Sequence, residues 1–204
     1  IHNYWIKKYR LFDSIYEKRK VEEKELKNIV KEIRDDKIVG VNVTVPFKKL
    51  IIPFLDKLDF TAKKTESVNT LFKVKNKVVG YNTDREGFAL TMRGPLLDPN
   101  DNMMPIILQR KNIFILGAGG VTSSIIDALQ HKGAKIFLSN RTKKKAEELK
   151  KKYAKVEVLD WGKRPSTCDI VINTTSIGLT EGEKIDIDFS DCGGDKDKLF
   201  YDLI

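Results

Sequence analysis

Three glycines, Gly117, Gly119 and Gly120, follow the apolar run 113–116. Glycine permits a sharp backbone turn and lets the chain approach a ligand closely, and the N–H groups at the start of a helix attract anions. An apolar strand that runs into glycines and then into a helix is typical of a loop that binds a dinucleotide pyrophosphate. Thr122 replaces the third glycine of that fingerprint, so the assignment depends on the surrounding elements.

The surrounding elements fit such a loop. Apolar residues at helical spacing predict a helix from Val121 to about His131, and Gly133 suits a left-handed C-terminal cap. The segment 134–139 predicts a second strand. Strand, helix and strand complete a crossover unit of the expected length, which favours dinucleotide binding over a tight turn without a ligand.

Polar residues after the second strand indicate which dinucleotide is bound. An NAD site uses a carboxylate there to hold the ribose 2′-hydroxyl, whereas an NADP site accepts an arginine near the 2′-phosphate. The chain has Asn140, Arg141 and Thr142, followed by the lysines 143–145. A guanidinium with no carboxylate in place suits a phosphate monoester, so the sequence predicts NADP. At least one of these lysines is expected to lie on the solvated first turn of the next helix.

A lysine and an aspartate earlier in the chain could transfer or orient a proton. The pattern predicts a strand ending at Thr44, a helix beginning at Pro46 and Lys48 in its first turn. A lysine there opposes the helix dipole and is a poor choice for stability alone, which favours a catalytic role. Asp84 follows another predicted strand, at an expected helix N-cap. Taken singly, Lys48 is also compatible with a surface charge and Asp84 with a cap alone.

Composition excludes several classes of protein. The 204 residues carry 38 Lys plus Arg against 29 Asp plus Glu, a net charge of +9, but the lysines alternate with acidic residues and form no aromatic-studded basic motif. We therefore expect a solvated surface that attracts anionic substrates, and no nucleic-acid partner. No apolar run is long enough for a membrane span, and no signal peptide is recognisable. Cys168 and Cys192 are too few for a disulfide framework or a zinc site, so we expect a cytoplasmic protein without a metal.

Strand and helix patterns alternate along the chain and predict an α/β fold. The expected helices are 2–9, 22–35, 47–58 (divided by Pro53), and one starting at Asp84; the expected strands are 14–16, 38–44, 69–74, 78–81, 169–172 and 199–204. The breaker-rich stretch 94–112 predicts a connection between two halves. We place the domain boundary so that residues 1–86 form the first domain and residues 87–204 the second.

Several short motifs together resemble the shikimate dehydrogenase family, in order and spacing. They are Asn42-Val43-Thr44-Val45-Pro46-Phe47-Lys48, Ser67-Val68-Asn69-Thr70-Leu71, Asn82-Thr83-Asp84, Gly117-Ala118-Gly119-Gly120, Asn140-Arg141-Thr142 and Asn173-Thr174-Thr175-Ser176-Ile177-Gly178. The resemblance extends from the His2-Asn3 pair to Tyr201-Asp202. It implies an N-terminal α/β substrate domain plus a C-terminal Rossmann NADP-binding domain, with the substrate in the cleft between them.

The resemblance also implies an activity and site residues. Family members reduce 3-dehydroshikimate to shikimate with NADPH, a step of chorismate and aromatic amino acid biosynthesis. Lys48 and Asp84 would be the catalytic pair and contact the substrate, while Thr44 and Asn69 would bind substrate hydroxyls. The cofactor residues would be Gly117, Ala118, Gly119, Gly120 and Val121 at the pyrophosphate; Asn140, Arg141, Thr142 and Lys145 at the 2′-phosphoribose; and Asn173, Thr174, Thr175 and Leu203 along the cofactor's edge and nicotinamide side.

Two departures and two alternatives accompany the resemblance. The family has two substrate-binding serines upstream of the pair matched by His2-Asn3, and it continues past the strand matched by Tyr201-Asp202; we therefore expect this chain to be a fragment lacking both termini. A quinate dehydrogenase using NAD would keep Lys48 and Asp84, although Arg141 argues against it. A non-catalytic dinucleotide-binding module is the alternative of another class. The protein is expected to act on a small molecule as a monomer or homodimer.

Overall fold

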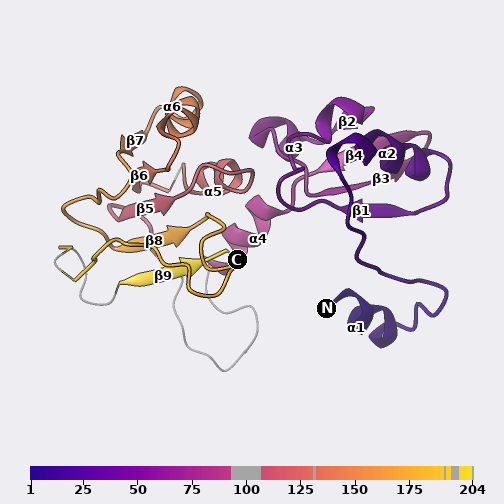
Figure 1. Ribbon diagram of the computed structural model, residues 1–204, viewed down its shortest axis with the longest axis horizontal. Coiled ribbons are helices and arrows are strands. Elements are labelled where there is room, and N and C mark those ends of the chain that lie inside the picture. Colours follow the sequence, from indigo (N-terminus) through magenta and orange to yellow (C-terminus); the bar gives the residue numbers. More distant parts are fainter. Residues whose placement is uncertain (93–106, 131, 191, 194–197, 204) are drawn as a thin grey trace.

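The computed structural model describes residues 1–92, 107–130, 132–190, 192–193 and 198–203. Two β-sheets lie side by side, and helix α4 (Asp84–Thr91) lies between them (Figure 1). We call the elements up to β4 the N-terminal half and those from β5 onward the C-terminal half. Nearly all of the expected connection 94–112 lies outside the described residues.

The N-terminal half is built on a four-stranded mixed sheet in the order β1-β3-β4-β2. Its strands are β1 (Gly40–Asn42), β2 (Lys57–Leu58), β3 (Thr70–Val74) and β4 (Lys77–Tyr81), and its helices are α1 (His2–Lys8), η1 (Glu23–Glu25), α2 (Leu26–Arg34), η2 (Ile52–Phe54) and α3 (Phe60–Thr65). The expected hairpin is confirmed as the antiparallel pair β3 and β4. Helix α2 buries Leu26, Ile29, Val30 and Ile33, a spacing that aligns them on one helical face.

Two expected elements of this half are wrong. No strand forms at 14–16; instead the backbone of Tyr16 bonds to the side chain of Asn3 on α1. The helix expected over 47–58 is replaced by turns, the short 3₁₀ helix η2 and strand β2. Proline disrupts helical hydrogen bonding, and Pro53 lies inside η2. Residues 57–58 cannot continue a helix because their backbone pairs in parallel with β4.

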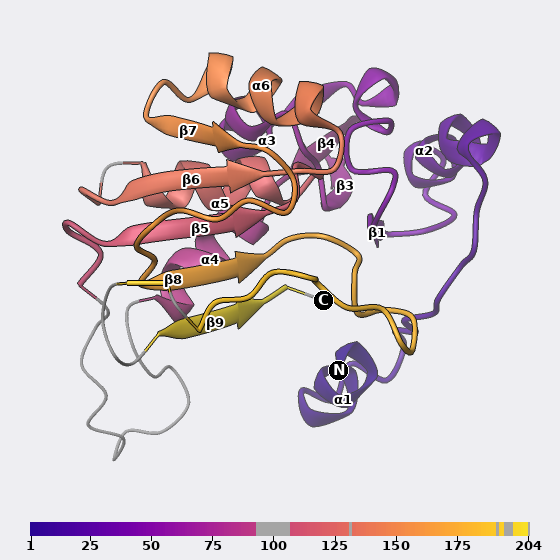
Figure 2. The same ribbon diagram turned by 60° about the vertical axis from the view of Figure 1, so that its left-hand side comes forward.

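The C-terminal half is a five-stranded parallel sheet in the order β7-β6-β5-β8-β9. Its elements are β5 (Asn112–Leu116), α5 (Thr122–Leu129), β6 (Lys135–Ser139), α6 (Lys143–Lys152), β7 (Val156–Leu159), β8 (Ile170–Asn173) and β9 (Leu199–Asp202). Numbered from its first strand the order is 3-2-1-4-5, which is Rossmann-like, with the topological switch between β5 and β8 (Figure 2). The expected α/β fold with a Rossmann half is confirmed.

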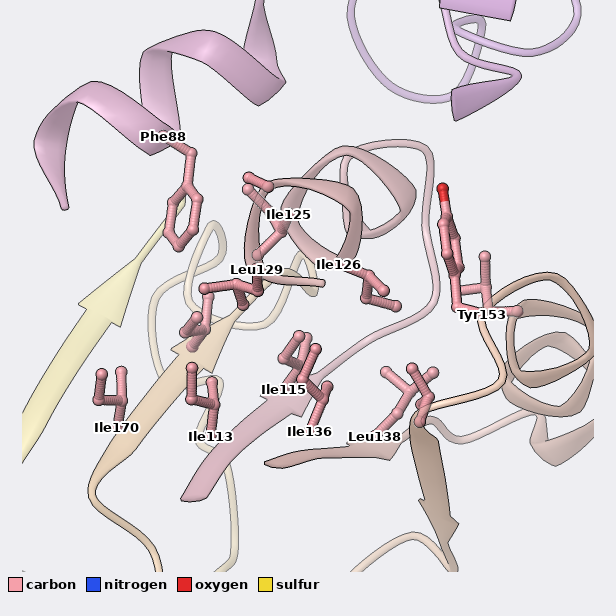
Figure 3. Close-up of a cluster of buried hydrophobic side chains, with 14 of the residues drawn as sticks. Phe88, Ile113, Ile115, Ile125, Ile126, Leu129, Ile136, Leu138, Tyr153 and Ile170 are labelled. Carbon is pink, nitrogen blue, oxygen red and sulfur yellow. The ribbon is translucent and has the colours of Figure 1, made fainter. Parts of the chain in front are cut away.

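The core of the C-terminal half lies between this sheet and α5. Ile125, Ile126 and Leu129 of α5 cover the isoleucines and leucines of β5 and β6 (Figure 3). Phe88 of α4 joins the same core, so α4 packs on the C-terminal half although it follows directly from β4. The expected end of the α5 helix at His131 lies outside the described residues, and Gly133 has the left-handed backbone (φ +75°) expected of a cap.

Candidate active site

Lys48 and Asp84 form an ion pair at the junction of the two halves. Lys48 Nζ lies 2.7 Å from Asp84 Oδ2, and the two side chains are 14% and 20% exposed. Lys48 stands in the turns between β1 and η2 rather than in a helix, so the helix-dipole argument for its role does not apply. Its backbone carbonyl instead accepts a hydrogen bond from Val68 N–H, which ties the lysine turn to the segment before β3.

Asp84 is the first residue of α4, and Thr83 occupies the N-cap position that we expected for Asp84. Its carboxylate accepts hydrogen bonds from two side chains: Oδ2 from Lys48 and Oδ1 from Asn69 Nδ2 at 2.7 Å. The carboxylate therefore does more than cap a helix. It anchors a cation in a half-buried place, where opposite charges interact more strongly than in bulk water.

Asn69 connects Asp84 to a chain of polar side chains. Its Oδ1 accepts from Thr70 Oγ1 at 3.1 Å and from Thr83 N–H at 3.1 Å. Thr70 Oγ1 in turn accepts from Asn42 Nδ2 at 3.0 Å. The structure thus gives Asn69 a direct role in orienting Asp84, while its contact with substrate hydroxyls stays a prediction.

The glycine loop follows β5 at the switch point of the parallel sheet. Gly117 has φ +105°, and a Cβ there would lie 2.7 Å from Thr174 Oγ1 and 2.9 Å from the Thr174 carbonyl carbon, so only glycine fits. Thr122, in place of the third glycine, is buried and bonds to Gly117 O at 3.2 Å and to Thr174 Oγ1 at 2.8 Å. The threonine therefore ties the loop to the end of β8.

The segment after β6 lies next to this loop. Asn140 Oδ1 accepts from Ala118 N–H at 3.0 Å, and its Nδ2 donates to Thr142 O at 2.8 Å, so one amide holds both loops together. Arg141, Thr142 and Lys145 are exposed, as a site for a phosphate monoester requires. Lys143, on the first turn of α6, bonds to Asp160 at 2.6 Å, which raises the pKa of this lysine.

A cleft of about 1450 Å³ contains both groups of residues. Of the predicted site residues, it is lined by Thr44, Lys48, Asp84, Gly117, Ala118, Gly119, Gly120, Val121, Asn140, Arg141, Thr142, Lys145, Thr174, Thr175 and Leu203. Asn69 and Asn173 do not line it. Asn173 is buried and braces the loop after β8, since its Oδ1 accepts from Thr175 N–H at 3.0 Å and its Nδ2 donates to Ile177 O at 3.2 Å.

The two groups meet at Gly120. A Cβ at this position would lie 3.2 Å from Lys48 Cβ, so the glycine loop of one half touches the lysine of the other. Contacts of this kind between halves cannot be read from the spacing of motifs.

The sequence analysis missed three residues of the cleft wall. Tyr201 of β9 bonds through its hydroxyl to Thr91 Oγ1 at 3.1 Å and packs edge-to-face on Phe88. Trp161 lies in the loop after β7, a strand that the sequence analysis did not identify. The alternating pattern of 156–159 was the available signal for that strand.

Comparisons with known proteins agree with this geometry. Residues 1–71 match the family model described as shikimate dehydrogenase substrate binding domain, and residues 102–183 match shikimate / quinate 5-dehydrogenase. A relative from Pelagibacter ubique, named shikimate dehydrogenase (NADP(+)), is 47% identical over 205 residues, which cover 100% of this chain and 72% of the relative. The chain belongs to the shikimate dehydrogenase family.

Solved structures of the family share its fold. Shikimate dehydrogenase of Aquifex aeolicus superposes with a TM-score of 0.75 at 37% identity, over 90% of this chain and 65% of that one. The Thermus thermophilus enzyme, solved in complex with NADP(H) and shikimate, gives a TM-score of 0.70 at 26% identity, over 90% and 65% of the two chains. The chain thus spans just under two thirds of the length of these two proteins. The family, the oxidoreductase class and the NADP cofactor predicted from the sequence are confirmed at this level.

Two searches of the described residues bear on other site types. None of the helices there is both long and apolar enough to cross a membrane. Within the same residues, no three or more His, Cys, Asp or Glu side chains are grouped so that they could hold a metal ion.

Proposed function

We propose that this protein reduces 3-dehydroshikimate to shikimate with NADPH, in the biosynthesis of chorismate and aromatic amino acids. The observation that carries the proposal is the Lys48–Asp84 pair, which faces the same cleft as the glycine loop and touches it through Gly120. A hydride transfer to a carbonyl requires a proton donor beside the oxygen and a nucleotide beside the carbon, and the cleft offers residues for both.

The donor set of the cleft fits NADP. Gly117 can have no side chain, which leaves the backbone open to a pyrophosphate at the start of α5. Arg141, Thr142 and Lys145 would hold the 2′-phosphate, while Thr174, Thr175 and Leu203 would contact the remainder of the cofactor. The bound nicotinamide supplies the hydride.

Lys48 acts at the oxygen of the substrate. Its ammonium group donates the proton that the carbonyl oxygen gains during reduction, and in the reverse direction its amine takes the proton from the hydroxyl. Asp84 favours the charged lysine and fixes its direction, and Asn69 fixes Asp84. Thr44, exposed at the rim of the same cleft, would bind a substrate hydroxyl.

The expected setting of the protein is part of the proposal. We infer that it acts on a small molecule in the cytoplasm, as a monomer or homodimer, without a nucleic-acid partner. Buried thiols are compatible with a reducing compartment: Cys168 and Cys192 are both free and buried.

A matrix of substrates and cofactors tests the function. The protein, extended where its gene allows, is mixed with shikimate or quinate and with NADP⁺ or NAD⁺, and formation of reduced nicotinamide is followed by absorbance. Turnover with shikimate and NADP⁺ at the highest kcat/KM is expected. A preference for quinate and NAD⁺ would support the alternative dehydrogenase, and binding of NADP⁺ without any turnover would support a non-catalytic module.

A further inference from the structure

Asp127 is a fully buried carboxylate for which the proposed mechanism has no use. It lies on α5, the helix that follows the glycine loop, and its side chain is 0% exposed. Arg85 Nε on α4 donates to its Oδ2 at 2.6 Å, and Lys64 Nζ on α3 lies 2.8 Å from its Oδ1. One carboxylate of the C-terminal half thus joins the connecting helix and the N-terminal half.

A second contact lies one turn away on the same face of α5. Ser124 Oγ donates to Asn82 Oδ1 at 3.1 Å, and the same amide oxygen lies 3.4 Å from Arg85 N–H. Residues three positions apart lie side by side on a helix, so Ser124 and Asp127 form one polar stripe. This stripe faces the first turn of α4, which carries Asp84.

Burying this carboxylate is not explained by stability. Removing a charge from water is costly, and apolar residues of similar size often stabilise a protein as well as a buried ion pair does. What an ion pair adds is a defined geometry. Here that geometry fixes Arg85, the residue next to Asp84 in the chain.

We propose that Asp127 is a positioning residue, which through Arg85 and Lys64 holds the first turn of α4, and with it Asp84, in register with the cofactor loop. The inference rests on the proposed function. The cofactor loop leads into α5 and the proton-transfer pair lies on the other side of the junction, so the two reactants meet correctly only while α5 is fixed to α3 and α4. A displacement of about 1 Å in such a site costs on the order of a hundredfold in rate.

The test compares Asp127→Asn, which keeps the shape and removes the charge, with Arg85→Met and with Glu66→Gln. Glu66→Gln is the matched control, because it removes the Lys152–Glu66 ion pair (2.9 Å), which also joins the two halves but does not contact α4. For Asp127→Asn and Arg85→Met we expect kcat with shikimate and NADP⁺ to fall at least tenfold. KM for shikimate and Kd for NADP⁺ should change less than threefold, and Glu66→Gln should leave kcat within about twofold.

Hydrogen exchange provides a reading that does not depend on turnover. Amides of 84–91 should exchange at least fivefold faster in Asp127→Asn and Arg85→Met than in the wild type or in Glu66→Gln. Arg85→Lys, which keeps the charge, should recover part of kcat and of the protection. The double variant Asp127→Asn with Arg85→Met should lose no more than the worse single variant, as expected of groups that act as a unit.

Several outcomes would overturn the inference: unchanged kcat in a folded Asp127→Asn variant, an equal loss in Glu66→Gln, or unchanged exchange across 84–91. If Asp127→Asn does not fold, Arg85→Met decides, because that side chain is 40% exposed and its loss leaves the core intact. If the wild type itself shows no turnover with shikimate, the proposed function fails, and the exchange rates still decide whether Asp127 fixes α4.

Discussion

At the scale of single residues, the glycines of the loop have unequal roles. Gly117 combines φ +105° with a Cβ position 2.7 Å from Thr174 Oγ1, whereas a Cβ at Gly119 would meet nothing nearer than 3.9 Å. Gly117→Ala should therefore lower the free energy of unfolding by about 2–4 kcal/mol, from backbone strain and overpacking. Gly119→Ala should cost less than about 1 kcal/mol. Urea unfolding of both variants measures this, and equal losses would contradict the assigned difference.

Arg141 should decide between the two dinucleotides. Arg141→Gln removes the charged donor expected at the 2′-phosphate, so Kd for NADP⁺ should rise about 10- to 100-fold while Kd for NAD⁺ stays nearly constant. Lys144→Gln is the matched control, because Lys144 is equally exposed but does not line the cleft. Calorimetric titration with both nucleotides measures the ratio. An equal loss for NADP⁺ and NAD⁺ would show that Arg141 does not contact the 2′-phosphate.

Motif residues could be predicted from the sequence because their chemistry is local. Gly117 must turn, and Arg141 must follow a particular strand. The roles of Asn69 and Asp127 could not be predicted, since each depends on partners that lie far away in the sequence: Asp84 for the first, Lys64 and Arg85 for the second. A lone aspartate on a helix carries no signal of what faces it.

At the scale of elements, Asp56 joins three of them. Its Oδ2 accepts from Val78 N–H on β4 at 2.7 Å, and Arg34 on α2 lies 3.0 Å from its Oδ1. These bonds, that to Val78 first, lower the pKa of Asp56 below its usual value. Because the folded-state pKa is lowered, the stabilisation is fully present above the unfolded-state pKa near 4 and is lost as the pH falls through the folded-state pKa.

Asp56→Asn should therefore destabilise the protein at neutral pH by about 1 kcal/mol, a modest value because the side chain is partly exposed. The difference from wild type should shrink below about pH 4, where the wild-type carboxylate is protonated as well. Urea unfolding at neutral and acidic pH measures both. A difference that does not change with pH would mean that the charge of Asp56 is not what stabilises this junction.

Elements with their own periodicity were predictable and those set by pairing were not. Helix α2 and the β3–β4 hairpin carry their signals in adjacent residues. Residues 47–58 contain apolar residues at helical spacing, yet the parallel pairing of 57–58 with β4 and the proline in η2 prevent a helix. Tertiary pairing overrides local propensity here, as it often does for short segments.

At the scale of the whole molecule, the two thiols report global opening. Cys168 is 0% exposed, and burial first, then Cys192, raises its pKa to about 12. Alkylation requires the thiolate, so the folded protein at pH 8 should react with iodoacetamide at least a hundredfold more slowly than a free cysteine. Labelling along a urea series, followed by mass spectrometry, should track unfolding. Rapid labelling without urea would show that this part of the C-terminal half opens locally.

The cleft is a property of both halves together. The sequence predicted which residues belong to it, because family motifs mark them, but not that Gly120 would touch Lys48 or that Asn69 would point away from the cleft wall. Such contacts depend on how the sheets are placed around α4, and that placement is fixed by side chains of several elements at once.

The central claim is that Lys48 performs proton transfer beside a separately bound NADP. The most direct measurement combines turnover of shikimate with NADP⁺ titration for Lys48→Met, which keeps most of the apolar stem, with Lys49→Met as control. Because a positioned general acid contributes about 10²- to 10⁴-fold, kcat should fall by at least a hundredfold with Kd for NADP⁺ changed less than threefold, and Lys49→Met should keep most of its activity. Retained turnover in Lys48→Met, or a parallel loss of NADP⁺ binding, would contradict the account.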